Sequence, residues 1–182
     1  MPVMIALLRA VNVSGKSKVN MDELSTLCAA LGHKDVRTYL QSGNVVFRTE
    51  QKSPSKIASD LEVAIEESLG VPTTVIARTA SDLRATIANN PWTERNLEPS
   101  KLLVAYFQSR PSEEALARAL TLRAGSDELH FAGREAFLYY PNGAGKATLN
   151  WGSLERMAKV PATTRNWNTT LKLLELCEAI KE

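Results

Sequence analysis

Residues 3–20 read Val-Met-Ile-Ala-Leu-Leu-Arg-Ala-Val-Asn-Val-Ser-Gly-Lys-Ser-Lys-Val-Asn, and this stretch decides the fold. The apolar run 3–8 is typical of a strand that is buried on both faces, and the polar, basic run after it is typical of a loop. Asn20 is placed to cap a helix that begins at Met21. A strand, a basic loop and a helix N-terminus in this order favour a site that holds an anion.

The composition indicates a folded and nearly neutral protein. The 182 residues are 44% hydrophobic, and 22 basic against 20 acidic residues give a net charge of +2. Such a chain can bury a sizeable core, but it lacks the strong positive field of a non-specific nucleic-acid binder. No apolar run approaches the ~20 residues of a membrane span. We therefore expect a cytoplasmic protein with no membrane partner.

Two cysteines and two histidines bear on metal and redox chemistry. Cys28 and Cys177 share helical spacing with apolar neighbours, which predicts that both are core residues. His33 follows a glycine at the end of a helix, and His130 alternates outward in a strand. Neither histidine has a Cys, Asp or Glu at the spacing of metal ligands, so we expect no metal and no cofactor.

The order of elements predicts an α+β fold made of two ferredoxin-like (split βαβ) halves, with mainly antiparallel sheets and helices. Domain boundaries are expected at 1–80 for an N-terminal βαββαβ half, 81–99 for a connecting helix and linker, and 100–182 for a C-terminal βαββα half with terminal helices. The predicted strands are 3–8, 35–41, 44–49, 73–78, 101–109, 128–131 and 135–140, and the predicted helices are 21–31, 53–69, 81–89, 112–123, 153–159 and 168–181.

Three motifs make the chain resemble a bacterial family known only as domain of unknown function 1697. They are Ala-Leu-Leu-Arg-Ala-Val-Asn-Val-Ser-Gly-Lys-Ser-Lys-Val (6–19), Arg-Thr-Tyr-Leu-Gln-Ser-Gly-Asn-Val-Val-Phe (37–47) and Thr-Thr-Arg-Asn-Trp-Asn-Thr (163–169). The resemblance implies a duplicated ferredoxin-like fold and no established activity. Family members usually look like Leu-Arg-Gly-Ile-Asn-Val-Gly-Gly-Lys, so Ala10 and Ser14 stand where glycines are common. If those glycines let backbone approach a ligand, this chain approaches it less closely.

Two short motifs look like nucleotide-binding loops. Residues 10–17 read Ala-x-x-x-x-Gly-Lys-Ser, but the first position is not glycine and the helix is predicted to begin at Asn20, too late for a P-loop lysine. No other predicted strand ends in an aspartate suited to magnesium, so a coincidental match is favoured over an NTPase. Residues 143–147, Gly-Ala-Gly-Lys-Ala, do not match the P-loop pattern at either end. A flexible loop, whose lysine can still contact an anion, is favoured there.

The topology of the predicted fold brings the loop that carries Arg9, Asn12, Lys16 and Lys18 close to the turn that carries Gln41, Ser42 and Asn44. In a ferredoxin-like unit the first and second strands run the same way, so the loop after the first strand emerges beside the hairpin between the second and third. The alternative is a solvated polar loop beside an ordinary turn. Against it, several amides, a hydroxyl and cations converge on this edge although the protein is nearly neutral overall. Residues 163–170 either cap a helix or add a second oxyanion site. The candidate anion-binding residues are Arg9, Asn12, Lys16, Lys18, Gln41, Ser42, Asn44, Arg165, Asn166 and Asn168.

Three functional hypotheses follow from the sequence. The first is binding of a phosphate-bearing ligand, either a nucleotide or a nucleic acid, at the polar and basic edge of the N-terminal half. The second is an enzyme that acts on a small anionic metabolite, with Arg9 and Arg165 as binding or charge-stabilising groups. The third is a structural or interaction protein without a ligand. The sequence names neither the ligand, the reaction nor the oligomeric state.

Overall fold

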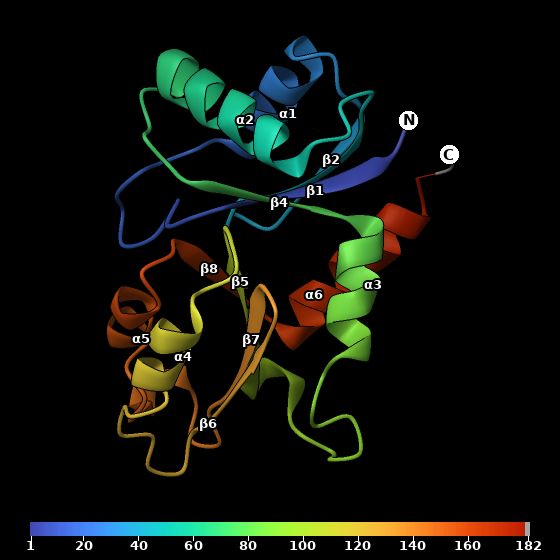
Figure 1. The fold of residues 1–182 in the computed structure, drawn as a ribbon. Helices are drawn as coiled ribbons and strands as arrows, with labels where there is room; N and C mark the ends of the chain where they lie inside the picture. Colours follow the sequence, from blue (N-terminus) through green and yellow to red (C-terminus); the bar gives the residue numbers. More distant parts are fainter. Residues whose placement is uncertain (181–182) are drawn as a thin grey trace. The chain divides into compact units, whose positions relative to one another are not determined.

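Two four-stranded antiparallel sheets form the framework of the protein (Figure 1). The structure is a computed structural model, and it describes residues 1–180. The elements of the first half are β1 Val3–Leu8, α1 Met21–Ala30, β2 Lys34–Tyr39, β3 Asn44–Arg48, α2 Pro54–Leu69, β4 Val75–Thr79 and α3 Ala80–Ala88. Those of the second half are β5 Leu102–Phe107, α4 Glu113–Ala119, β6 Glu128–Ala132, β7 Glu135–Tyr139, α5 Trp151–Ala158, β8 Ala162–Asn166 and α6 Trp167–Glu178, with short 3-10 helices at Pro99–Lys101 and Ala144–Lys146.

The first sheet has the ferredoxin-like strand order β2-β3-β1-β4. Because β3 is antiparallel to both β1 and β2, the latter two strands run in the same direction, as predicted. Helices α1 and α2 lie together on one face of this sheet (Figure 1). Their apolar faces and the facing strand residues form a core that includes Met4, Leu24, Phe47 and Leu61.

The second sheet repeats this order as β6-β7-β5-β8, which confirms the predicted α+β duplication. One strand of it was not predicted, because residues 163–170 were expected to start a helix and the half was expected to be βαββα. Residues 162–166 instead form β8, paired antiparallel with β5, so the second half is also βαββαβ. Helix α4 is shorter than the predicted 112–123. It ends at Ala119, and just beyond it the Thr121 hydroxyl bonds to the carbonyl of Arg118 at 2.7 Å, a local contact that competes with helix continuation.

The chain groups into two compact units whose division differs from the sequence order of the halves. One unit comprises Met1–Ala85 together with the residues from Lys172 onward, and the other comprises Thr86–Leu171. Helices α3 and α6 therefore each contribute residues to both units. The predicted domain boundaries, 1–80, 81–99 and 100–182, stay a prediction.

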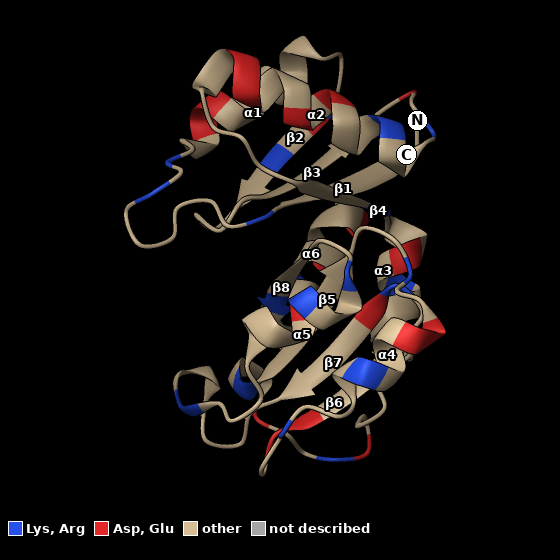
Figure 2. Cartoon of the chain, turned by 60° about the vertical axis from the view of Figure 1, so that its left-hand side comes forward, with Lys and Arg blue, Asp and Glu red and all other residues tan. Residues whose placement is uncertain are grey.

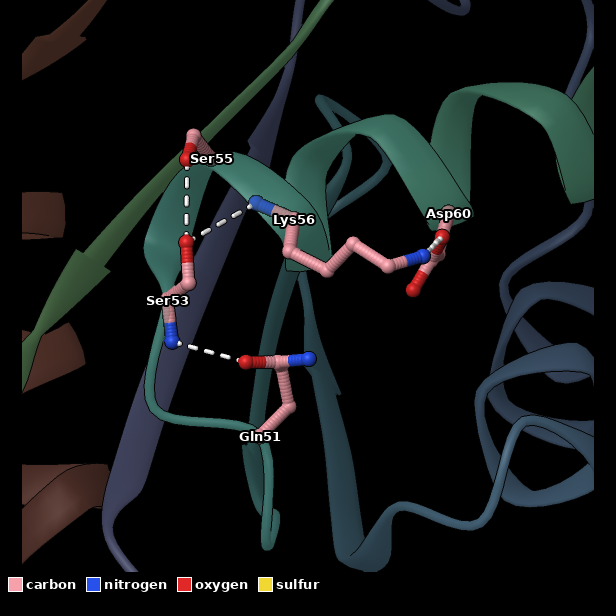
Figure 3. Close-up of polar contacts among 5 residues, drawn as sticks. All are labelled: Gln51, Ser53, Ser55, Lys56 and Asp60. Carbon is pink, nitrogen blue, oxygen red and sulfur yellow. Dashed lines mark hydrogen bonds and ion pairs between the residues drawn. The ribbon is translucent and has the colours of Figure 1, made fainter.

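Local signals in the sequence set the helix ends. The side chain of Asn20 accepts hydrogen bonds from the amides of Asp22 and Glu23, at 2.8 and 3.2 Å, and so begins α1 as predicted. Ser53 does the same for α2 by accepting from the Lys56 amide at 3.3 Å, and Gln51 holds the Ser53 amide (Figure 3). Gly70 ends α2 in the left-handed conformation, with φ of +67°.

Both cysteines are core residues, which confirms that prediction. Cys28 is fully buried on α1 and Cys177 is buried on α6, and each is a free thiol. Burial raises the pKa of both thiols to about 12, and the backbone contact of Cys28 and the charge of Arg84 beside Cys177 offset this only in part. Neither thiol is therefore activated as a nucleophile at neutral pH.

His33 is an unusual core residue of the first unit. Its ring stacks on Phe47, with the ring centroids 4.3 Å apart, and it is 8% exposed. Within residues 1–180 neither ring nitrogen has a hydrogen-bond partner. Burial lowers the pKa of His33 below its ordinary value of 6.5, and the carboxylate of Asp60 opposes this shift more weakly. The folded state therefore favours the neutral imidazole.

This burial predicts a pH dependence of stability that one substitution removes. A lowered folded-state pKa means that the unfolded chain binds more protons, so stability is full above pH 6.5 and falls as the pH drops through that value. His33→Phe, which retains a ring beside Phe47, should flatten the dependence between about pH 7.5 and 5.5 and raise stability at the acid end. Urea unfolding across this range measures it. The exposed His130 is the control, and equal slopes for His33→Phe and His130→Phe would refute the assignment.

Candidate functional site

The loop between β1 and α1, residues 9–20, is folded into a small hairpin. Val13 and Lys16 form an isolated antiparallel bridge, and the Lys16 amide donates to the Val13 carbonyl at 3.1 Å. Ser14 and Gly15 make the turn between them, with φ values of +53° and +72°. Positive φ at both central residues is typical of the tight turns that close hairpins. Lys16 stands four residues before the Asn20 cap of α1. In a P-loop the lysine lies at the N-terminus of the helix itself, so the two geometries differ.

The Asn12 side chain fixes this loop against the β2–β3 turn. Its amide nitrogen donates to the carbonyls of Val19 and Gln41 at 2.9 and 2.7 Å, and its oxygen accepts from the Val19 amide at 2.9 Å. The two segments thus meet at one end of the sheet, as the topology predicted. All three side-chain hydrogen bonds of Asn12 are to the backbone of Val19 and Gln41, so the structure gives Asn12 a scaffolding role.

Gly43 lets the β2–β3 turn approach the end of β1. Its carbonyl accepts from the Leu8 amide at 2.8 Å, and its φ is +82°. A Cβ atom at this position would lie 2.7 Å from Leu8 Cβ and 2.8 Å from Val11 Cγ2. Such distances are not found between real side chains, so only glycine fits without a shift of the neighbouring segments.

Asn44 and Ser42 also contribute to the shape of this turn. Asn44 is fully buried, and its amide nitrogen donates to the Tyr39 carbonyl at 2.6 Å and to the Ser42 hydroxyl at 3.0 Å. The sequence predicted that both would face a ligand. In the structure the buried Asn44 organises the turn that receives the Asn12 contact, and a ligand contact of either residue stays a prediction.

Lys16 and Lys18 are the exposed cations of the loop, and Figure 2 shows basic segments along it. Among the ion pairs of residues 1–180, none involves either lysine. In the same view the ribbons of the neighbouring helices α1 and α2 carry red segments, which mark Asp and Glu residues. The loop therefore carries local positive charge on a nearly neutral surface.

Arg9 lies in a different setting. It lines a depression of about 450 Å³ together with Glu62 and Glu66 of α2. Its backbone is tied to the segment before β4, because its amide donates to Thr74 and its carbonyl accepts from the Thr73 hydroxyl at 2.8 Å. The two glutamates were missed by the sequence interpretation, although their spacing of four residues places them on one side of a helix. Their charges disfavour an oxyanion in this depression.

The residues predicted around 163–170 lie in the second unit, and most of them are used within the fold. Arg165 is 6% exposed on β8, and it donates to the Thr163 hydroxyl at 2.7 Å and the Thr164 carbonyl at 2.8 Å. Burial lowers its pKa to about 10, and the nearby Tyr106 opposes the shift. Asn166 caps α6 by accepting from the Thr169 amide at 2.9 Å, while Asn168 is exposed. A contact of either residue with an oxyanion stays a prediction.

Across residues 1–180, no three His, Cys, Asp or Glu side chains are placed to share a metal ion. In the same residues, no helix combines the length and the apolar character that a membrane crossing needs.

Comparison with known proteins assigns a family. Residues 1–137 match the family described as "Protein of unknown function (DUF1697)". The chain belongs to this family. A solved structure of the conserved bacterial protein SP0830 from Streptococcus pneumoniae is similar to it, with a TM-score of 0.74 and 23% identity over 97% of this chain and 98% of that one. At this identity the likeness shows the fold alone. Among curated proteins, none matches the chain.

The conformation of the β1–α1 loop favours glycine at positions 10 and 14, where the resemblance implied glycines. Ala10 and Ser14 occupy the two positions concerned, and both are in the left-handed region, with φ of +55° and +53°. Glycine reaches this region without the steric penalty of a Cβ atom. The backbone alone therefore favours glycine at these positions, whether or not a ligand is present.

Proposed function

We propose that the protein binds a phosphate-bearing ligand, either a nucleotide or a nucleic acid, through Lys16 and Lys18 of the β1–α1 loop. The observation that supports the proposal is that two exposed lysines stand on a loop whose backbone is held by hydrogen bonds. The Val13–Lys16 bridge and the contacts of Asn12 define the conformation of the loop before any ligand arrives. A preorganised loop loses less conformational entropy on binding than a flexible one.

The chemistry of the two lysines suits a phosphate group. An ammonium group donates up to three hydrogen bonds and attracts phosphate as a point charge. Asp22 and Glu23, in the first turn of α1, limit the approach of an anion from the helix side. The proposed contact is accordingly the turn itself, and Arg9 has a secondary part because Glu62 and Glu66 share its depression.

A thermal-shift screen with nucleotides, sugar phosphates and oligonucleotides tests the proposal, since a ligand of the native state raises the melting temperature. Lys16→Gln and Lys18→Gln should each weaken binding of the compound that gives the shift by about three- to tenfold. Lys52→Gln, in the connection between β3 and α2, is the control and should do little. For an oligonucleotide, each loop substitution should also reduce the slope of log K against log salt by about 0.7–0.9.

The outcomes separate the hypotheses. A hit confined to small phosphorylated metabolites favours the enzyme alternative, and an oligonucleotide hit favours the nucleic-acid version. Equal losses from Lys16→Gln and Lys52→Gln would show only a loss of positive charge and would reject the loop as the site. No shift with any compound would leave the interaction protein as the better hypothesis.

A further inference from the structure

The second unit contains a pocket that none of the sequence motifs predicted. It has a volume of about 450 Å³ and lies beside the N-terminal end of α5, against β5, β8 and the loop after β7. We infer that this pocket binds a small, uncharged, planar heteroaromatic molecule of the size of an indole or a nucleobase. The residues that carry the inference are Leu103, Tyr140, Gly145, Leu149, Trp151 and Thr164.

The pocket has a largely fixed aromatic and aliphatic wall. Tyr140 and Leu149 are 3% and 1% exposed, and both belong to the core of the second unit. The Trp151 ring packs against Phe107, with the ring centroids 6.5 Å apart at an angle of 47°. Trp151 is therefore anchored in the core while it also lines the pocket. Aromatic rings held in this way favour flat ligands, which they contact over a large area.

The residues that line the pocket are uncharged, and the Arg156 guanidinium lies 3.6 Å from the position that a Cβ on Gly152 would take. None of the ten residues that line the pocket, all within the described part of the chain, is acidic, basic or a histidine. By contrast, the depression beside Arg9 is lined by three charged side chains, Arg9, Glu62 and Glu66. Because an ion leaves water at a high free-energy cost when no opposite charge meets it, the uncharged wall favours a neutral ligand.

A few polar groups can orient such a ligand. The Tyr140 hydroxyl donates to the Leu149 carbonyl at 3.4 Å, a long contact that leaves the oxygen able to accept a further hydrogen bond. Burial, with the charge of Asp127 as a smaller cause, raises the pKa of Tyr140 to about 12, so the hydroxyl stays protonated at neutral pH. Thr164 on β8 also lines the pocket, and a threonine hydroxyl can both donate and accept a hydrogen bond. Ring nitrogens and N–H groups of a heteroaromatic ligand match these partners.

Two glycines of the wall have no conformational reason to be glycine. Gly145 and Gly152 lack a positive φ, a Cβ at Gly145 would meet nothing within 4 Å, and one at Gly152 would make only ordinary contacts. Glycine in the first turn of a helix such as α5 is less stable than alanine. The absence of side chains at these two positions is consistent with space kept for a ligand.

Tryptophan signals provide the direct test. The protein has three tryptophans, so a ¹⁵N-labelled sample gives three indole N–H signals, and only Trp151 lines the pocket. Titration with indole or adenine should shift the Trp151 signal saturably, with a Kd of about 1 mM or lower. The signals of Trp92 and Trp167 should stay in place, and cyclohexanol, which is not planar, should have little effect. A Trp151 signal that does not move, or three signals that move together without saturation, would overturn the inference.

Substitutions of residues in and outside the pocket test whether the probe binds there. Trp151→Leu should weaken probe binding by about tenfold or more, as followed on the backbone amides of Gly145 and Gly152. Trp92→Leu removes a tryptophan of the same unit outside the pocket and should leave the affinity unchanged. Ala147→Leu enlarges a wall residue without removing a contact and should also weaken binding. If Trp151→Leu does not fold, the wild-type titration and Ala147→Leu still decide the question.

Discussion

Replacing Gly43 by alanine should lower the free energy of unfolding by about 2–5 kcal/mol. Two effects add at this position. The left-handed conformation, with φ of +82°, disfavours any residue with a Cβ atom by about 1–2 kcal/mol. The new Cβ would also lie 2.7 Å from Leu8 Cβ, where β1 ends, and relieving that overlap costs about 1–3 kcal/mol more. Urea unfolding, with the m-value checked for constancy, measures the sum.

Gly32 is a matched control for the steric part of this effect. Its φ of +86° is nearly the same, but a Cβ there would meet nothing within 4 Å. Gly32→Ala should therefore lose only the conformational contribution of about 1–2 kcal/mol. Equal losses at Gly32 and Gly43 would show that the close approach of the β2–β3 turn to β1 has no energetic weight.

The sequence predicted the first unit well because its signals are local. Asn20, Ser53 and Gly70 mark helix ends with side chains and conformations that act within four residues. The apolar run of β1 predicts a strand that is buried on both faces, and all six residues of β1 are buried. The parallel direction of β1 and β2 then follows from the ferredoxin-like element order, which is why the meeting of the two loops was predictable.

Strand β8 was not predictable in the same way. Its residues, Ala-Thr-Thr-Arg-Asn, show no alternation of apolar and polar side chains, and an arginine in a strand suggests exposure. Arg165 is nevertheless buried opposite Val104, the third residue of β5, and Arg78 is buried opposite Ile5, the third residue of β1. The two halves therefore repeat a buried arginine at equivalent positions. Only the pairing of the strands reveals this, since neighbouring residues do not repeat.

The candidate site shows the same limit at the level of single side chains. An asparagine in a polar loop offers the same donors to a ligand as to its own backbone, so composition cannot separate the two uses. What separates them for Asn12 is its contact with Gln41, which is 29 positions away in the sequence. The Asn12 amide nitrogen donates to the Gln41 carbonyl at 2.7 Å. For Lys16 and Lys18 the chain supplies no such partner within residues 1–180, and these two remain the candidates for contact with a ligand.

The contacts of Asn12 lead to the second large effect, which depends on pH. Asn12→Asp should destabilise the protein by about 2–4 kcal/mol at neutral pH, because the carboxylate loses two donors and faces the carbonyls of Val19 and Gln41. Asn12→Ala should lose less, because it adds no repulsion. The folded state disfavours the charged carboxylate, so its folded-state pKa lies above the unfolded value of about 3.9. The penalty of the Asp variant is therefore full at neutral pH and shrinks as the pH falls through the folded-state pKa.

Urea unfolding of the wild type, Asn12→Ala and Asn12→Asp at about pH 7 and pH 4 measures this difference. The exposed lysines of the loop attract the new carboxylate and oppose the effect, so the series is run at about 0.15 M salt, which screens exposed charges. Asn20→Ala, which removes the cap of α1 from the same loop, is the control and should lose about 1 kcal/mol at both pH values. An Asp variant as stable as the wild type at neutral pH would mean that the Asn12 donors do not hold the two loops together. The fixed presentation of Lys16 and Lys18 would then lose its physical basis.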